Sequence, residues 1–152
     1  MTGTPASIPH LMINFTNENQ KPKKIDCGPA SYSLSFDAPA QAGAASPPLV
    51  LHCTLGSCRY LPELLELLQT KKAFVFVLGN PTADGTIEKS GFRYDVTDAV
   101  LDHISITGEP GLEEIAVSIK VQTDSEFHYF GKTHDNQGKE ISLDDTYIWK
   151  QH

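Results

Sequence analysis

The sequence feature that most constrains the fold is an alternation of apolar and polar residues in the segment IAVSIKV, residues 115–121. Ile115, Val117, Ile119 and Val121 recur at every second position. Because successive side chains of a strand point to opposite faces, this period is typical of a strand with one buried and one solvated side. Such a strand needs neighbours to pair with, so the segment predicts an antiparallel sheet.

Further segments rich in β-branched and aromatic residues predict the partner strands. They lie at residues 10–15, 24–36, 49–55, 73–78, 92–107 and 126–130, and the chain closes with TYIWK. About seven or eight short strands separated by turns, without an internal repeat, are typical of a barrel or sandwich. We therefore expect one mainly β domain over residues 1–152, with two sheets.

One segment, SCRYLPELLELLQTKK, has helical rather than strand periodicity. Leu61, Leu64, Leu65 and Leu68 follow the spacing of an apolar helix stripe. Pro62 is a residue that the first turn of a helix tolerates well. The sequence therefore predicts a single α-helix that flanks the sheets.

Composition and charge exclude several classes of protein. The chain is 39% hydrophobic and carries a net charge of -7, from 19 acidic and 12 basic residues. This balance provides no basic surface for nucleic acid or an anionic membrane. The apolar runs are too short for a membrane span, and the N-terminus lacks the pattern of a signal peptide. Three cysteines are too few for a disulfide framework, so we expect synthesis in a cytoplasm.

Two groups of histidines and cysteines are candidate metal ligands. His52, Cys53 and Cys58 form an H-C-x4-C grouping, but the second ligand pair of a structural zinc site does not follow. His128 and His134 flank HYFGKTH, which does not match the HExxH pattern. Buried thiols and exposed loop histidines are the favoured interpretations, so the sequence predicts no metal and no cofactor.

Three carboxylates, Asp95, Asp98 and Asp102, would share a face on a helix. The β-branched content of residues 92–107 favours a strand instead, on which Asp95 points away from the other two. Asp98 and Asp102 then fall among apolar positions, which indicates a β-bulge or a polar subunit contact. With no nucleophile or phosphate-binding motif in the chain, the sequence predicts no catalytic residues and no enzyme.

The segment DAPAQAGAASPP, residues 37–48, contains small residues and proline without periodicity. It cannot bury enough apolar surface to fold by itself, so it is expected to be an extended flexible loop. Residues 1–9, with two prolines among small residues, are expected to be a loose lead-in. Trp149 near the chain end must dock on this subunit or on a neighbour.

The order of these elements resembles the Hcp (haemolysin-coregulated protein) family, the tail-tube subunits of type VI secretion systems. The first strand HLMINF leads to an isoleucine-aspartate step and a serine-rich strand, and a loop of small residues precedes the proline-led helix. VTDAVLDHISITG and LEEIAVSIKV are similar to the family's long strand and its partner, and YIW to its C-terminal Y-x-W. A related contractile-injection or phage-tail tube protein is an open alternative.

The resemblance implies a barrel-like fold of two sheets with one flanking helix. It also implies bacterial six-membered rings that stack into a tube, which a contracting sheath propels outward and which can carry effectors. Sheath, spike and baseplate proteins would be partners, and the protein would leave the cytoplasm through the apparatus. The loop would contact a neighbouring subunit or ring through Asp37, Pro39, Gln41, Ser46, Pro47 and Pro48.

Two other functions stay open on the sequence. A small β-barrel could bind a ligand or metal through one of the histidine-containing groups, and it would then have an internal cavity. A hydrolase could use Asp98 and Asp102, and it would lose activity when Asp102 is changed to Asn.

Overall fold

The computed structural model describes residues 9–16, 19–56, 59–80 and 91–151. Eight strands and one helix lie within these residues. They are β1 His10–Thr16, β2 Pro22–Leu34, β3 Leu49–Leu55, α1 Leu61–Thr70, β4 Phe74–Gly79, β5 Gly91–Thr107, β6 Glu114–Val121, β7 Ser125–His134 and β8 Glu140–Trp149. The predicted lead-in lies outside the described residues except for Pro9.

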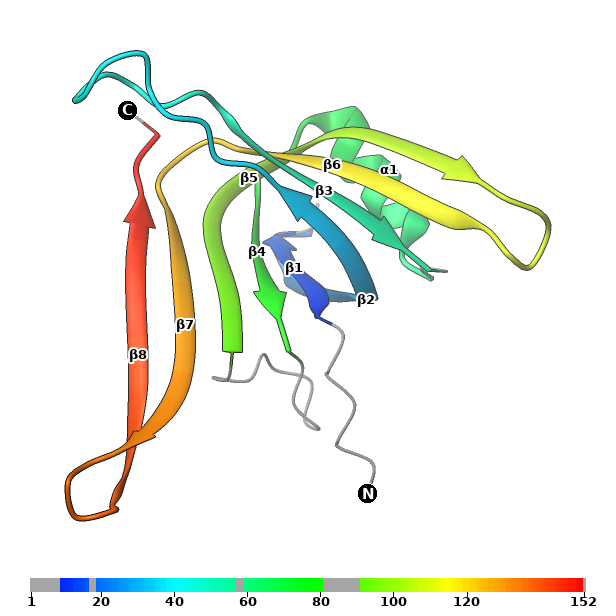
Figure 1. Ribbon diagram of the computed structural model, residues 1–152. Helices are drawn as coiled ribbons and strands as arrows, with labels where there is room; N and C mark the ends of the chain where they lie inside the picture. Colours follow the sequence, from blue (N-terminus) through cyan, green and yellow to red (C-terminus); the bar gives the residue numbers. More distant parts are fainter. Residues whose placement is uncertain (1–8, 17–18, 57–58, 81–90, 152) are drawn as a thin grey trace.

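The strands form one continuous antiparallel sheet that closes on itself (Figure 1). Its order is β4-β1-β2-β3-β6-β5-β7-β8, and an additional pairing of β4 with β5 completes a barrel. The β7–β8 hairpin lies outside this ring and pairs with it through β5. The prediction of a mainly β barrel with one flanking helix is therefore confirmed, and the barrel and its added hairpin are parts of the same sheet.

Strand β5 connects the barrel to the hairpin, and along its 17 residues the set of side chains that faces the interior changes. Between Val96 and Ala99 it carries one more residue than its partner β4, and its pairing with β6 shifts again around Asp102. Such bulges turn the following side chains to the other face. The buried side chains are accordingly Tyr94 and Val96 before the first bulge, and Ala99 and Leu101 after it.

The interior of the barrel is filled by apolar side chains from all six of its strands. In β6 the alternating face predicted from the sequence is buried, which confirms that strand's orientation. Burying one large aliphatic or aromatic side chain stabilises a fold by about 1.5–3 kcal/mol. The most deeply buried large residues include Ile13, Ile25, Leu51, Leu55, Phe76, Leu78, Tyr94 and Ile119.

Helix α1 packs against the barrel with a face that differs from the predicted one. Leu64 and Leu67 are buried, and Leu61 and Leu68 are half-buried against the core. Leu65 is 43% exposed, so its assignment to the apolar stripe was wrong. Because successive helical residues are about 100° apart, a buried face centred between Leu64 and Leu67 turns Leu65 toward solvent.

Several connections extend beyond the barrel (Figure 1). The β2–β3 loop, in cyan, projects on the side where the chain ends, and the β5–β6 hairpin projects from another side. The β7–β8 hairpin runs alongside the barrel and continues past it. Among the described residues, no helix is long and apolar enough to cross a membrane.

Candidate functional site

The loop predicted as a subunit contact, residues 37–48, is the connection between β2 and β3. It lacks strand or helix structure, and the amide of Ala44 donates to the carbonyl of Gln41 in a turn at its tip. Gly43 in this turn has a φ of 83°, a conformation that glycine adopts readily. Of the candidate contact residues, four are exposed and two half-buried. The exposed ones are Asp37, Gln41, Pro47 and Pro48, and the half-buried ones are Pro39 and Ser46.

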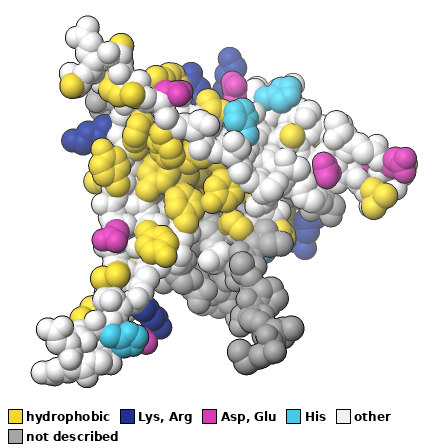
Figure 2. Space-filling model, viewed as in Figure 1, with side chains coloured by type: hydrophobic (Ala, Val, Ile, Leu, Met, Phe, Trp, Pro, Cys, Tyr) yellow, Lys and Arg dark blue, Asp and Glu magenta, His cyan; other side chains and the backbone are white. Residues whose placement is uncertain are grey.

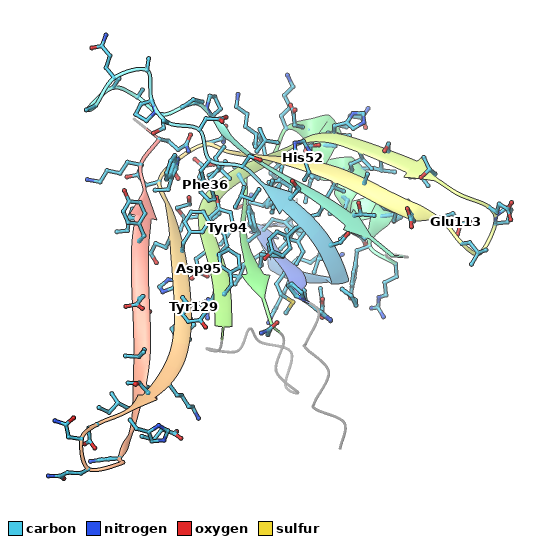
Figure 3. The ribbon with its side chains drawn as sticks, in the orientation of Figure 1. Phe36, His52, Tyr94, Asp95, Glu113 and Tyr129 are labelled. Carbon is cyan, nitrogen blue, oxygen red and sulfur yellow. The ribbon has the colours of Figure 1, made fainter. Side chains whose placement is uncertain are left out.

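The base of this loop is held by aromatic contacts to the added hairpin. The ring centroid of Phe36 lies 4.9 Å from that of Phe127 and 4.9 Å from that of Trp149, both in edge-on geometry. Edge-on aromatic pairs contribute about 0.5–1.5 kcal/mol beyond their burial. Trp149 thus docks within its own subunit, and its contact with Phe36 ties the end of β8 to the start of the loop. Figure 3 labels Phe36 at the base of this loop.

The β7–β8 hairpin presents a row of exposed apolar side chains, which we call the apolar stripe: Tyr129, Ile141, Leu143 and Tyr147. The β7–β8 register places all four on one face of the hairpin. Tyr129 is 60% exposed and Tyr147 66% exposed. Yellow side chains gather over the adjoining face of the barrel in Figure 2. An exposed apolar surface of this kind is typical of a protein interface.

Strand β8 is an edge of the sheet, because β7 is the one strand that pairs with it among the described residues. Its side chains are exposed from Glu140 to Ile148, and Trp149 is half-buried. An edge strand of ten residues leaves a long row of backbone donors and acceptors without sheet partners. The apolar stripe and this edge therefore belong to the same surface.

The grouping of His52 with Cys53 is not a metal site within the described residues. The two side chains are neighbours on β3 and point to opposite faces, so Cys53 is buried whereas His52 is exposed. The Nδ1 of His52 lies 3.0 Å from the hydroxyl of Ser118 on β6. Burial raises the pKa of Cys53 to about 12, as expected of a core thiol. Cys58 lies outside the described residues.

The three aspartates of β5 have separate surroundings. The side chain of Asp98 accepts a hydrogen bond of 2.8 Å from Gln122 Nε2, and its carbonyl accepts one from the Gln122 amide. Asp102 is exposed at the second bulge. Asp95 pairs with Arg93. The predicted bulge explanation is confirmed, and the structure does not bring the carboxylates together as an acid-base pair.

His128 and His134 do not form a joint site either. They lie six positions apart on β7, about 20 Å along a strand, and His134 is exposed near the turn. His128 instead contacts carboxylates that the sequence did not associate with it, namely Asp95, Glu126 and Asp144. These residues come from three strands, so the pairing of β5 with β7 and of β7 with β8 was needed to find them.

Comparison with known proteins places this architecture among solved structures. No protein-family model matches the chain, and no curated protein matches it by sequence. Solved structures match at low identity over most of their length. A structure described as a type six secretion system protein is 14% identical with a TM-score of 0.53, covering 93% of this chain and 94% of that one.

The crystal structure of Hcp1 from Salmonella typhimurium is 14% identical with a TM-score of 0.51, covering 90% of this chain and 93% of that one. The protein has the Hcp fold. A type VI secretion system effector from Yersinia pestis is 12% identical with a TM-score of 0.51, covering 89% and 98%. The Hcp fold thus extends over about nine-tenths of the present chain.

Proposed function

We propose that this Hcp-fold protein is a structural tube subunit of a bacterial type VI secretion apparatus. Its subunits form six-membered rings, and the rings stack into a tube that carries effectors and is exported with them. The observation that carries the proposal is the Hcp fold, which covers about nine-tenths of both this chain and the solved Hcp1 chain.

The surfaces of the subunit support self-assembly. A ring requires a heterologous interface, in which one patch of each subunit fits a different patch of the next. The apolar stripe and the β8 edge offer one such patch, and burying them would remove both an exposed apolar row and an open strand edge. A stable contact of this kind buries at least about 1,200 Å².

The β2–β3 loop supplies a second surface. Its base is fixed by Phe36, while residues such as Gln41 and Pro47 beyond it are exposed. A projecting segment with little contact to its own subunit is suited to contact a neighbouring subunit or ring. In this proposal Asp37, Pro39, Gln41, Ser46, Pro47 and Pro48 are the contact residues.

The experiment that tests the proposal measures the mass of the purified protein in solution together with negative-stain electron microscopy. Rings with a central hole and a mass of six subunits are the expected result. A monomer at high concentration, without rings, would overturn the proposal.

Two variants locate the interface. Leu143→Glu places a charge in the apolar stripe and is expected to abolish rings without unfolding the subunit. Ser142→Glu is its control, because Ser142 is also exposed, lies on the opposite face of β8 and has Lys132 as its cross-strand partner. If both variants or neither variant abolished rings, the stripe would not be the contact surface.

The loop is tested by a shortened variant in which residues 38–47 are replaced by a short Gly-Ser connection. Shortening a surface loop has little effect on folding, so a change in assembly can be assigned to the contact itself. A control of unchanged length, with residues 41–46 replaced by Gly and Ser, separates loop chemistry from loop reach. Unchanged ring formation and stacking in both variants would exclude the loop as a contact.

The barrel interior does not favour the alternative of a ligand-binding barrel. Large side chains such as Phe76, Tyr94 and Ile119 occupy it. A barrel of this size is filled by its own side chains or holds one small ligand, and here the side chains occupy the space. The tube-subunit proposal is therefore the one that the geometry supports best.

A further inference from the structure

We propose that Asp95, Glu126 and His128 form a binding site for a first-row divalent transition-metal cation. The site lies where the added hairpin pairs with the barrel, and it does not depend on the proposed tube function. In the described part of the chain, these residues bring three potential ligand atoms within 4.8 Å of one another.

The sheet register assembles the three ligands on one face. The β5–β7 pairing sets Asp95 directly opposite Glu126. Glu126 and His128 are two positions apart on β7, so their side chains point to the same side. His128 is 15% exposed, which leaves its ring close to the surface but largely fixed. Tyr129, three residues beyond Glu126 on β7, pairs with Phe92 and lies on the opposite face of the sheet from these ligands.

The distances fit a shared cation better than direct hydrogen bonds. The Nε2 of His128 lies 3.3 Å from Asp95 Oδ2 and 3.3 Å from Glu126 Oε2. A charge-assisted hydrogen bond of this kind is usually about 2.7–2.9 Å long. Two ligand atoms around a tetrahedral metal, each about 2.1 Å from it, are about 3.4 Å apart. The Nε2 atom of His128 is equally far from the carboxylates of Asp95 and Glu126. This spacing suits a metal ion that all three groups bind.

The other nitrogen of His128 is held in the way that metal-binding histidines are held. The hydroxyl of Thr146 donates its proton to Asp144 Oδ1 at 2.9 Å. The oxygen of the same hydroxyl can therefore accept a hydrogen bond from His128 Nδ1, which lies 2.9 Å from it. With its proton on Nδ1, the ring turns the lone pair of Nε2 toward Asp95 and Glu126. A histidine whose second nitrogen is anchored through a carboxylate is the usual arrangement around a metal ligand.

The local charge also calls for a cation. With a neutral imidazole, the carboxylates of Asp95 and Glu126 lie beside the guanidinium of Arg93, and these three groups together carry one net negative charge. Directly opposed carboxylates such as Asp95 and Glu126 destabilise a strand pair. Arg93 Nε donates to both oxygens of Asp95, at 3.1 and 3.0 Å, and a carboxylate retains lone pairs for a metal. A bound cation would offset this negative charge.

The ligand set identifies the class of cation. One imidazole with two carboxylates suits zinc and its first-row neighbours, whereas Mg²⁺ and Ca²⁺ favour oxygen ligands alone. A fourth position would be open to water. Because the ligands come from β5 and β7, and the groups behind His128 come from β8, the bound ion would fasten the hairpin to the barrel.

The test is isothermal titration of metal-stripped protein with Zn²⁺, with Mg²⁺ and Ca²⁺ as competitors. One zinc per chain, not displaced by either competitor, is the expected result. Zinc at about 100 times its dissociation constant should also shift the folding equilibrium about 100-fold, seen as a higher midpoint of thermal unfolding. Absence of stoichiometric zinc binding would overturn the proposal.

Substitutions assign the ligands. His128→Gln and Glu126→Gln should each abolish stoichiometric binding, and Asp144→Asn should weaken it about 10–100-fold. His134→Gln is the matched control on the same strand and should bind zinc as the unchanged protein does. Retained binding in folded Glu126→Gln, whose change preserves the size of an exposed side chain, would overturn the assignment. X-ray absorption of the zinc-loaded protein should show nitrogen and oxygen neighbours, and sulfur neighbours would place the ion at a cysteine instead.

Discussion

Tyr94 and Phe127 stack face to face across the β5–β7 pairing, with ring centroids 4.1 Å apart and ring planes inclined by 10°. Tyr94 is fully buried in the barrel, and its hydroxyl donates to Ser125 Oγ at 3.1 Å. Phe127 also contacts Phe36 at the base of the β2–β3 loop. These contacts make the start of β7 the point at which barrel, hairpin and loop are joined.

Phe127→Ala should therefore loosen both the hairpin and the loop. The ring is partly buried, so the free energy of unfolding should fall by about 2–4 kcal/mol, at or below the range for fully buried phenylalanines. Urea denaturation measures this loss, and hydrogen exchange should show faster exchange in β7 and β8 than in β3. Tyr129→Ala, on the same strand but 60% exposed, should change stability by less than about 0.5 kcal/mol. Equal effects of the two changes would contradict the anchoring role.

Tyr94→Phe should alter how stability depends on pH. Burial raises the pKa of Tyr94 to about 12, whereas an unfolded tyrosine loses its proton near 10. Between these values the folded state binds more protons, so the stability that Tyr94 contributes is complete below about pH 10 and is lost toward about pH 12. The Tyr94→Phe variant has no phenol to ionise at this position, so its free energy of unfolding should fall less between about pH 10 and about pH 12 than that of the unchanged protein.

At neutral pH the same variant should lose about 1–3 kcal/mol, because Ser125 remains buried without its partner. Urea denaturation at a series of pH values from 7 to 11 measures both effects. A parallel decline of the two proteins above pH 10 would contradict the assignment to Tyr94.

Cys53 should be unreactive in the folded protein. Burial raises its pKa to about 12, so only about 1 in 10,000 of these thiols is ionised at pH 8. In a Cys58→Ser background, a thiol reagent at pH 8 should modify Cys53 only after denaturant is added. Rapid native labelling that disappears in Cys53→Ala would contradict this expectation.

Asp98 and Asp102 should respond differently to substitution. Asp98→Ala removes the 2.8 Å hydrogen bond from Gln122 and should lower the free energy of unfolding by about 0.5–1.5 kcal/mol. Asp102→Asn alters an exposed side chain and should change stability by less than about 0.5 kcal/mol. Chemical denaturation of both variants measures the difference, and a larger loss in Asp102→Asn would refute it.

Leu67→Ala and Leu65→Ala form a matched pair on α1. Leu67 is buried against the core, so its truncation should cost about 2–5 kcal/mol. Leu65 is 43% exposed, and its truncation should cost well under half as much. Thermal and urea unfolding of both variants decide which leucine faces the barrel, and the reverse order would restore the stripe predicted from the sequence.

The sequence by itself determined the elements whose signals are local. The alternation of β6, the leucine-rich helix after a proline and the small-residue loop before β3 can each be read within a short window, because side-chain period follows directly from backbone geometry. The order of these elements was enough to indicate the Hcp fold, although no more than 14% of residues are identical in the solved structures described above.

The tertiary structure decided what depends on pairing between distant segments. The pairing of β4 with β5 closes the barrel, and the bulges of β5 decide which face holds Asp98. His128 meets Asp95 and Asp144 only because β7 lies between β5 and β8. Register is set by how side chains from many strands fill one interior, so a window of neighbouring residues does not contain it. The same packing turned Leu67 rather than Leu65 toward the core.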